Sequence, residues 1–169
     1  VTLMTSFNDV VKWRRMFHQY PELSKYEYKT TQRIKDILTS YNIKMIDIPM
    51  ETGLVAEIGQ GEKCIAVRTD IDALPIQEQV SQDFTSTNDG VMHACGHDIH
   101  MASILAIATK LKEEEEQLNG RVRFLFQPAE ELGYGAKAMA KTNALDDVQA
   151  IVGFHNYPTL DIGEFAIKS

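Results

Sequence analysis

Apolar residues recur at helical spacing over the first forty residues and predict two amphipathic helices. A Ser6–Asp9 capping box opens the first helix, and Pro21 ends it. A second capping box, Ser24–Glu27, opens a longer helix that we expect to stop near Asn42. The apolar faces are formed by Phe7, Val10, Val11 and Phe17 in the first helix and by Ile34, Ile37, Leu38 and Tyr41 in the second.

Three short runs of β-forming residues follow and predict strands at residues 43–48, 54–58 and 64–69. The Gly-Gln-Gly-Glu stretch at residues 59–62 is typical of a hairpin turn, so we expect the last two strands to pair with each other. Cys64 opens the third strand, and we interpret it as a core residue.

The hydrophobic residues of segment 70–96 show no regular spacing, so we interpret this segment as a long loop. Loops of this length inside compact domains are usually functional. The helix expected at residues 98–117 is apolar nearly all round in its first half, which is typical of a buried helix. Further strands are expected at residues 121–127, 150–154 and 163–168, and a further helix at 136–145. Helices that alternate with apolar strands predict an α/β fold with helices on the faces of a sheet.

The composition and net charge of the chain exclude some classes of binding partner. The 169 residues are 44% hydrophobic and 24% charged, which is ordinary for a globular protein. The formal net charge is −7 and the basic cluster at residues 12–15 is short, so we exclude nucleic acid and membrane surfaces as main partners. Two cysteines, Cys64 and Cys95, make no disulfide framework and suit a reducing compartment. We therefore expect a soluble, cytoplasmic protein.

The polar residues that follow the predicted strands form an unusual set. Asp70 and Asp72 follow one strand, and His155 follows another. Glu130 and Glu131 come after the strand that lies between these two in sequence. Ligand sites of such sheets lie beyond the carboxyl ends of the strands, so these side chains are expected to converge on one edge.

The segment MHACGHDIH, residues 92–100, enters the buried helix at the same edge and adds Cys95 and His97. Thiolate, imidazole and carboxylate from distant segments are what a transition-metal site requires. Glu130 and Glu131 are adjacent, so we expect their side chains to diverge. One would then ligate a metal, while the other would stay free as a general base.

Four segments carry these residues in order along the chain: RTDIDALP at 68–75, MHACGHDIH at 92–100, QPAEE at 127–131 and GFHNYP at 153–158. In order and spacing they resemble the amidohydrolase branch of the M20 metallopeptidases, which includes aminoacylases, hippurate hydrolases and indole-acetyl amino acid hydrolases. HQYPELS at 18–24 is similar to the N-terminal signature of that branch. The resemblance thus covers nearly the whole chain.

The resemblance implies a zinc-peptidase-like catalytic domain with a mixed, largely parallel sheet flanked by helices. It implies two divalent metal ions, Mn²⁺ or Zn²⁺, and Glu130 as the catalytic base. Asp70 would be an orienting carboxylate. The reaction implied is hydrolysis of the amide bond of a small N-acyl amino acid, by an enzyme that is a homodimer at full length. The implied metal ligands are Cys95, His97, Glu131 and His155.

Two departures from the family pattern, Thr69 for Ala and Leu132 for Gly, touch no proposed role. Members of the family continue with a lid or dimerisation domain and then with the rest of the catalytic domain. We therefore expect residues 1–169 to be part of a metallohydrolase catalytic domain. The alternative is a truncated, non-catalytic remnant that folds and binds metal or a partner chain.

Three histidines that do not belong to the implied ligand set, His18, His93 and His100, each allow a structural and a functional interpretation. His18 either caps the end of its helix or serves function. His100 lies one helical turn from His97, and a structural hydrogen bond is favoured over a place in the pocket. His93 is open in the same way.

Overall fold

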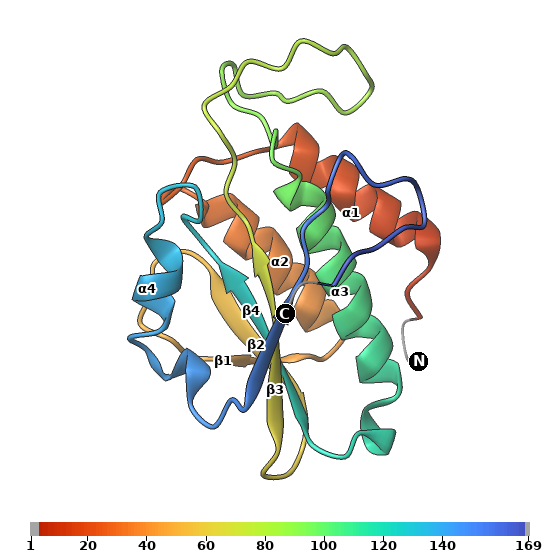
Figure 1. Cartoon of the computed structure of the whole chain (residues 1–169), viewed down its shortest axis with the longest axis vertical. Coiled ribbons are helices and arrows are strands. Elements are labelled where there is room, and N and C mark those ends of the chain that lie inside the picture. The colour runs from red at the N-terminus through yellow and green to blue at the C-terminus, as the bar shows by residue number, and fades with distance from the viewer. Residues whose placement is uncertain (1–3, 168–169) are drawn as a thin grey trace.

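The computed structural model describes residues 4–167, which form a mixed five-stranded sheet flanked by helices (Figure 1). The fold class expected from the sequence is therefore confirmed. The helices are α1 (Phe7–Gln19), α2 (Tyr28–Ser40), α3 (His97–Glu113) and α4 (Gly135–Met139), and the strands are β1 (Lys44–Ile46), β2 (Leu54–Gly59), β3 (Cys64–Asp70), β4 (Arg121–Gln127) and β5 (Ala150–Gly153). Within residues 4–167, every helix is too short or too polar to cross a bilayer.

The strands are arranged in the order β1-β2-β4-β3-β5. β4 is antiparallel to β2 and parallel to β3, while β5 is parallel to β3 on the other side. The predicted hairpin between β2 and β3 is therefore wrong, because β4 lies between them. The turn carries the chain across the start of β4, where Arg121 N–H donates to the oxygen of Lys63 over 2.7 Å.

The two faces of the sheet bury cores of unequal size. β2 and β4 alternate between them, with Phe124 on the side of α1, α2 and α3, and Leu125 on the side of α4. This alternation follows from the period of two in a strand. The larger core also contains Phe17, Ile34, Leu38, Met101, Ile104 and Leu105, all fully buried. Cys64 is completely buried, in agreement with its interpretation as a core residue.

The two predicted capping boxes have different outcomes. In α1 the box is present: Asp9 N–H donates to Ser6 Oγ, and Ser6 N–H donates to Asp9 Oδ2. In α2 it is absent, because Ser24 Oγ donates to Asp72 Oδ2 over 2.7 Å instead. The buried carboxylate of Glu27 accepts the N–H of Ala129 over 2.7 Å. Tertiary contacts therefore take both groups that would have capped the helix.

The later elements are shorter than expected. α3 ends at Glu113, and a separate 3₁₀ turn spans Glu115–Gln117. The helix predicted at residues 136–145 is divided into α4 and a 3₁₀ turn at Asn143–Leu145. The strand predicted at residues 163–168 is wrong for 163–167, where the side chains of Phe165 and Ile167 are exposed and no strand forms. Lys168 lies outside the described residues.

Candidate metal centre

Three neighbouring strands end at one edge of the sheet and deliver the residues expected there. β3 ends at Asp70, in register with Gln127 at the end of β4. β5 ends at Gly153 on the other side of β3. The long connection after β3 projects from this edge and returns to it at the start of α3 (Figure 1). Because β3, β4 and β5 run parallel, the residues that follow them come together.

His97, the first residue of α3, is buried and has its two ring nitrogens in different surroundings. Nδ1 lies 2.8 Å from the backbone oxygen of Asp72 and 3.3 Å from Asp72 Oδ1. Nε2 has no hydrogen-bond partner among the described residues, and three carboxylates, of Asp70, Glu131 and Glu130, lie 3.7, 3.7 and 3.8 Å from it. A proton on Nδ1 leaves the Nε2 lone pair free, as in metal-binding imidazoles.

Carboxylates shift the pKa values of neighbouring groups at this edge. Burial alone lowers the pKa of His97, but its hydrogen bond with Asp72 and the charge of Asp70 outweigh burial and raise it. Burial and the charge of Glu131 together raise the pKa of the Cys95 thiol to about 11. The carboxylate contributions to the two pKa shifts indicate local negative charge that a cation would neutralise.

Asp70 lies beside His100, the third histidine of the MHACGHDIH segment. Its Oδ1 accepts a hydrogen bond from His100 Nδ1 over 2.7 Å, and its Oδ2 accepts one from Arg68 over 2.9 Å. Burial raises the pKa of Asp70, but the His100 hydrogen bond and the charges of His97 and Arg68 outweigh burial and lower it to about 2. Asp70 is thus an ionised carboxylate that fixes His100 against His97, whose ring centroid is 5.4 Å away.

Glu130 and Glu131 do not diverge, contrary to the expectation from their adjacency. β4 ends at Gln127, and Ala129 has a left-handed backbone with φ of 48°, so the two glutamates lie in a turn rather than on an extended strand. Both carboxylates face His97 Nε2. Their exposure differs, since the Glu130 side chain is 39% exposed and that of Glu131 is 22% exposed.

Cys95, which precedes α3, and His155, which follows β5, complete the cluster. Cys95 Sγ lies 3.4 Å from His155 Nε2, and His155 Nδ1 donates to the oxygen of Asn156 over 2.7 Å. Gly96 makes this approach possible: its φ is 85°, and a Cβ there would lie 2.3 Å from Asn156 Oδ1. A glycine is therefore required at position 96, between the predicted metal ligands Cys95 and His97.

The donor atoms fit a divalent metal ion. Those of Cys95, His97 and His155 lie within 4.8 Å of one another, as do those of His97, Glu130 and Glu131. Two of them, His97 Nε2 and Glu131 Oε1, are buried without a hydrogen-bond partner in the described part of the chain. Thiolate, imidazole and carboxylate are transition-metal ligands. The structure thus brings all five residues predicted as metal ligands or base into one cluster.

Sequence reasoning gave no role to two residues that organise this cluster. Asp72 Oδ2 accepts the backbone N–H of Glu131 over 3.0 Å, while its other oxygen faces His97. Asn156 N–H donates to His100 Nε2 over 3.1 Å. The signals were present, because Asp72 is the second acid of the Asp-Ile-Asp segment and Asn156 follows His155 directly. His100 is hydrogen-bonded through both ring nitrogens, as the structural interpretation expected.

A second polar cluster, here called the His18 cluster, consists of Arg14, His18, Glu78 and Asp98. His18 Nδ1 lies 2.7 Å from Asp98 Oδ2, and its Nε2 lies 3.0 Å from Glu78 Oε1. Arg14 Nε lies 3.0 Å from Asp98 Oδ2. His18 therefore joins α1 to α3 and to the long loop and does not cap its own helix. His93 is buried nearby, and burial lowers its pKa to about 4.

Comparisons with known proteins agree with this geometry. The profile of peptidase family M20/M25/M40 matches residues 66–169. Two Bacillus subtilis relatives are an N-acetylcysteine deacetylase, 46% identical over 94% of this chain and 43% of its own, and an N-acetyl-L-cysteine deacetylase, 44% identical over 100% of this chain and 41% of its own. The chain thus spans less than half the length of either.

A solved structure of a related protein has the same fold. A Bacillus subtilis protein described as a dinuclear metal binding peptidase from the M20 family superposes with a TM-score of 0.88. It is 47% identical to this chain, and the match covers 90% of this chain and 44% of that one. The sheet and its flanking helices are therefore those of a known catalytic fold.

Proposed function

The chain belongs to peptidase family M20/M25/M40, and from that premise we propose that it hydrolyses the amide bond of N-acyl amino acids. The two relatives named as deacetylases of N-acetylated cysteine support this reaction class. The observation that carries the proposal is the buried Nε2 of His97, which has no hydrogen-bond partner within residues 4–167 and has a thiol and two glutamates around it.

Cys95, His97, Glu131 and His155 would hold the metal. Glu131 suits a ligand role because its Oε1 is buried without a partner in residues 4–167 and its backbone is anchored to Asp72. A divalent metal ion supplies Lewis-acid polarisation of the amide carbonyl and of water when it is bound. We propose two such ions, Mn²⁺ or Zn²⁺, in line with the dinuclear description of the related structure.

Glu130 is the proposed general base. It is the more exposed of the two glutamates, so water and substrate reach it, while its carboxylate still lies 3.8 Å from His97 Nε2. Glu130 accepts a proton from the attacking water and donates it to the nitrogen of the leaving amine as the C–N bond breaks. One water is consumed, and a carboxylic acid and a free amino acid are released.

The remaining parts of the proposal concern the whole protein. We propose that residues 1–169 are part of the catalytic domain of an enzyme that is a homodimer at full length and takes a small N-acyl amino acid. Two free cysteines, Cys64 and Cys95, support a reducing, cytoplasmic setting.

The test compares Glu130→Gln with Glu131→Gln after loading with Mn²⁺ or Zn²⁺. Turnover of N-acetyl-L-cysteine and N-benzoyl amino acids and metal content by elemental analysis are measured together. We expect Glu130→Gln to keep its metal and to lose turnover by at least about 100-fold, the scale of general-base catalysis. Glu131→Gln should lose metal.

Two outcomes would count against the proposal. Unchanged turnover in Glu130→Gln would exclude it as the base. A folded, metal-loaded wild-type chain without turnover would favour the alternative in which these residues bind metal but do not catalyse.

A further inference from the structure

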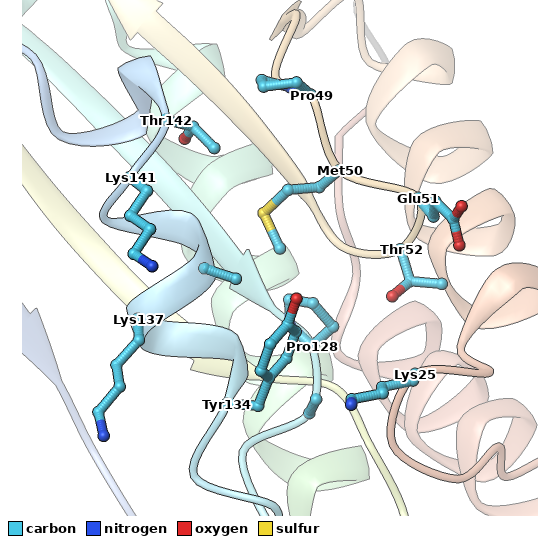
Figure 2. A pocket seen from close by; sticks show the side chains of 12 residues that line it. Lys25, Pro49, Met50, Glu51, Thr52, Pro128, Tyr134, Lys137, Lys141 and Thr142 are labelled. Carbon is cyan, nitrogen blue, oxygen red and sulfur yellow. The ribbon is translucent and has the colours of Figure 1, made fainter.

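A cavity of about 610 Å³ lies between α4 and the connection from β1 to β2, apart from the candidate metal centre (Figure 2). Pro128 and Tyr134 lie at its centre in this view, with Lys137 and Lys141 on one side and Lys25 on the other. The cavity falls within the volume range of small-molecule sites. The three lysines come from two separate parts of the chain, residue 25 and residues 137–141.

Two glycines allow the walls to close on Pro128. A Cβ at Gly135, the first residue of α4, would lie 1.5 Å from the backbone oxygen of Pro128. A Cβ at Gly53, whose φ is 79°, would lie 2.5 Å from Pro128 Cδ. The floor of the cavity is therefore held between α4 and the β1–β2 connection, so the site is preformed.

Positive charge gathers at this cavity although the chain as a whole carries −7. Over residues 4–167, no carboxylate forms an ion pair with Lys25, Lys137 or Lys141. The Lys25 ammonium lies 4.4 Å from the centroid of the Tyr134 ring. Glu51, the acidic residue of the lining, accepts a hydrogen bond from Tyr28 over 3.2 Å. The local charge is net positive and unneutralised.

Two of the four non-glycine residues with a left-handed backbone in residues 4–167 line this cavity. Lys25 has a φ of 71° and Ala129 a φ of 48°, and both line it. Such conformations are costly for residues other than glycine and cluster at ligand sites. Glu27, completely buried, holds Ala129 in place by accepting its N–H over 2.7 Å.

We propose that this cavity binds a small organic anion, namely a carboxylate with an apolar chain or ring. The carboxylate would lie against an ammonium group that points inward, that of Lys25 or of Lys141, while Lys137 points away from Tyr134 and adds to the positive charge around the cavity (Figure 2). The side chains of Met50, Pro128 and Tyr134 would contact the apolar part. A simple inorganic anion would leave most of 610 Å³ and its apolar floor unused. The proposal stands without the proposed function, since no residue of the candidate metal centre lines the cavity.

The test titrates hexanoate into the full chain carrying Cys95→Ala, without added metal, so that a carboxylate has no metal to bind. Backbone amide shifts in NMR spectra locate the site, and the dissociation constant is read from them. Hexanamide is the neutral match of the probe, and inorganic phosphate is the anion without an apolar part. We expect hexanoate to shift Thr52, Tyr134 and Ala138 and to bind more tightly than either control.

Lysine variants identify the charges that bind. Replacing Lys25, Lys137 or Lys141 singly by Gln should weaken hexanoate binding roughly threefold, as for exposed ion pairs, and replacing all three should abolish it. Lys35→Gln, an exposed lysine of α2 that does not line the cavity, is the matched control and should bind as the parent does.

Three results would overturn the proposal. Equal binding of hexanamide would show that charge is not recognised. Equal binding of phosphate would show that the apolar part is not recognised. Undiminished binding by the folded triple variant would place hexanoate elsewhere.

Discussion

The first turn of α3 separates two clusters made of the same residue types. His97 belongs to the candidate metal centre, and its neighbour Asp98 belongs to the His18 cluster. In the His18 cluster each imidazole nitrogen has a carboxylate oxygen within 3.0 Å, and Glu78 also accepts the N–H of Ser86 over 2.7 Å. At the candidate metal centre, the carboxylate oxygens that face His97 Nε2 lie at 3.7 Å or more from it.

The difference shows that two clusters which both combine histidine with carboxylates differ in how the histidine is paired: His18 is paired at both ring nitrogens, and His97 only at Nδ1 among residues 4–167. Arg14 and His18 offset the charges of Asp98 and Glu78, so the His18 cluster is close to neutral. Both ring nitrogens of His18 are paired, while Asp98 Oδ1 and Arg14 Nε have no hydrogen-bond partner among residues 4–167. Such a network fixes the fold. At the candidate metal centre three carboxylates surround His97 Nε2, and a divalent cation would offset their charge.

The largest expected contrast is in stability. Asp98→Ala leaves His18 and Arg14 without their shared carboxylate, and removal of one partner of a buried ion pair costs about 3 to 5 kcal/mol. Glu131→Ala removes one of three carboxylates near His97 Nε2 and should cost less than about 1 kcal/mol without metal. Urea denaturation gives both free energies of unfolding. Equal losses would break the distinction between the clusters.

For metal affinity we expect the opposite order, with the larger loss on mutation of the candidate metal centre and the smaller loss on mutation of the His18 cluster. His97→Ala removes the residue common to all three groups of converging donor atoms and should weaken Zn²⁺ or Mn²⁺ binding by more than about 100-fold. His18→Ala should change the affinity only a few-fold in the protein that remains folded. Competition with a chromogenic chelator measures both constants. Comparable losses in the two variants would mean that the His18 cluster is part of the metal site.

The smallest effect concerns pH. The hydrogen bond with Asp98 raises the pKa of His18 above its ordinary value of 6.5, against the opposing effect of burial. The stabilisation is therefore complete below pH 6.5 and is lost as the pH rises through the raised pKa. We expect the free energy of unfolding to fall over that window, and less steeply in His18→Gln. Denaturation at a series of pH values checks this. Identical slopes would mean that His18 is not the titrating group.

The sequence predicted most elements of the fold because each carries its own local signal. The Ser6–Asp9 capping box joins residues three apart, and the apolar face of α2 repeats every three or four residues. The order of the strands carries no such signal: whether β2 pairs with β3 or with β4 is decided by long-range packing of Phe124 and Phe126. Ser24 likewise bonds with Asp72, 48 residues away, which no local pattern reveals.

The candidate site was predictable for a similar reason. A strand end followed by a metal-ligand type is a local pattern, and the parallel strands bring Glu130, Glu131 and His155 together at one edge. Cys95 and His97 reach the same edge at the start of α3. The direction in which Glu130 points was not predictable, because it depends on the left-handed Ala129 and on Glu27, which is 102 residues away. The roles of Asp72 and Asn156 depend on equally remote partners.

The position of β4 between β2 and β3 sets the order in which the molecule can be assembled. During synthesis, residues 54–70 leave the ribosome well before residues 121–127, so the middle of the sheet stays open until its last partner arrives. A hairpin of β2 with β3, the pairing that the turn favours locally, would have to separate to admit β4. Glu130 and Glu131 follow β4 at once, so the carboxylates reach His97 only after this insertion. The cluster of donor atoms can therefore form only late in assembly, after β4 has inserted between β2 and β3.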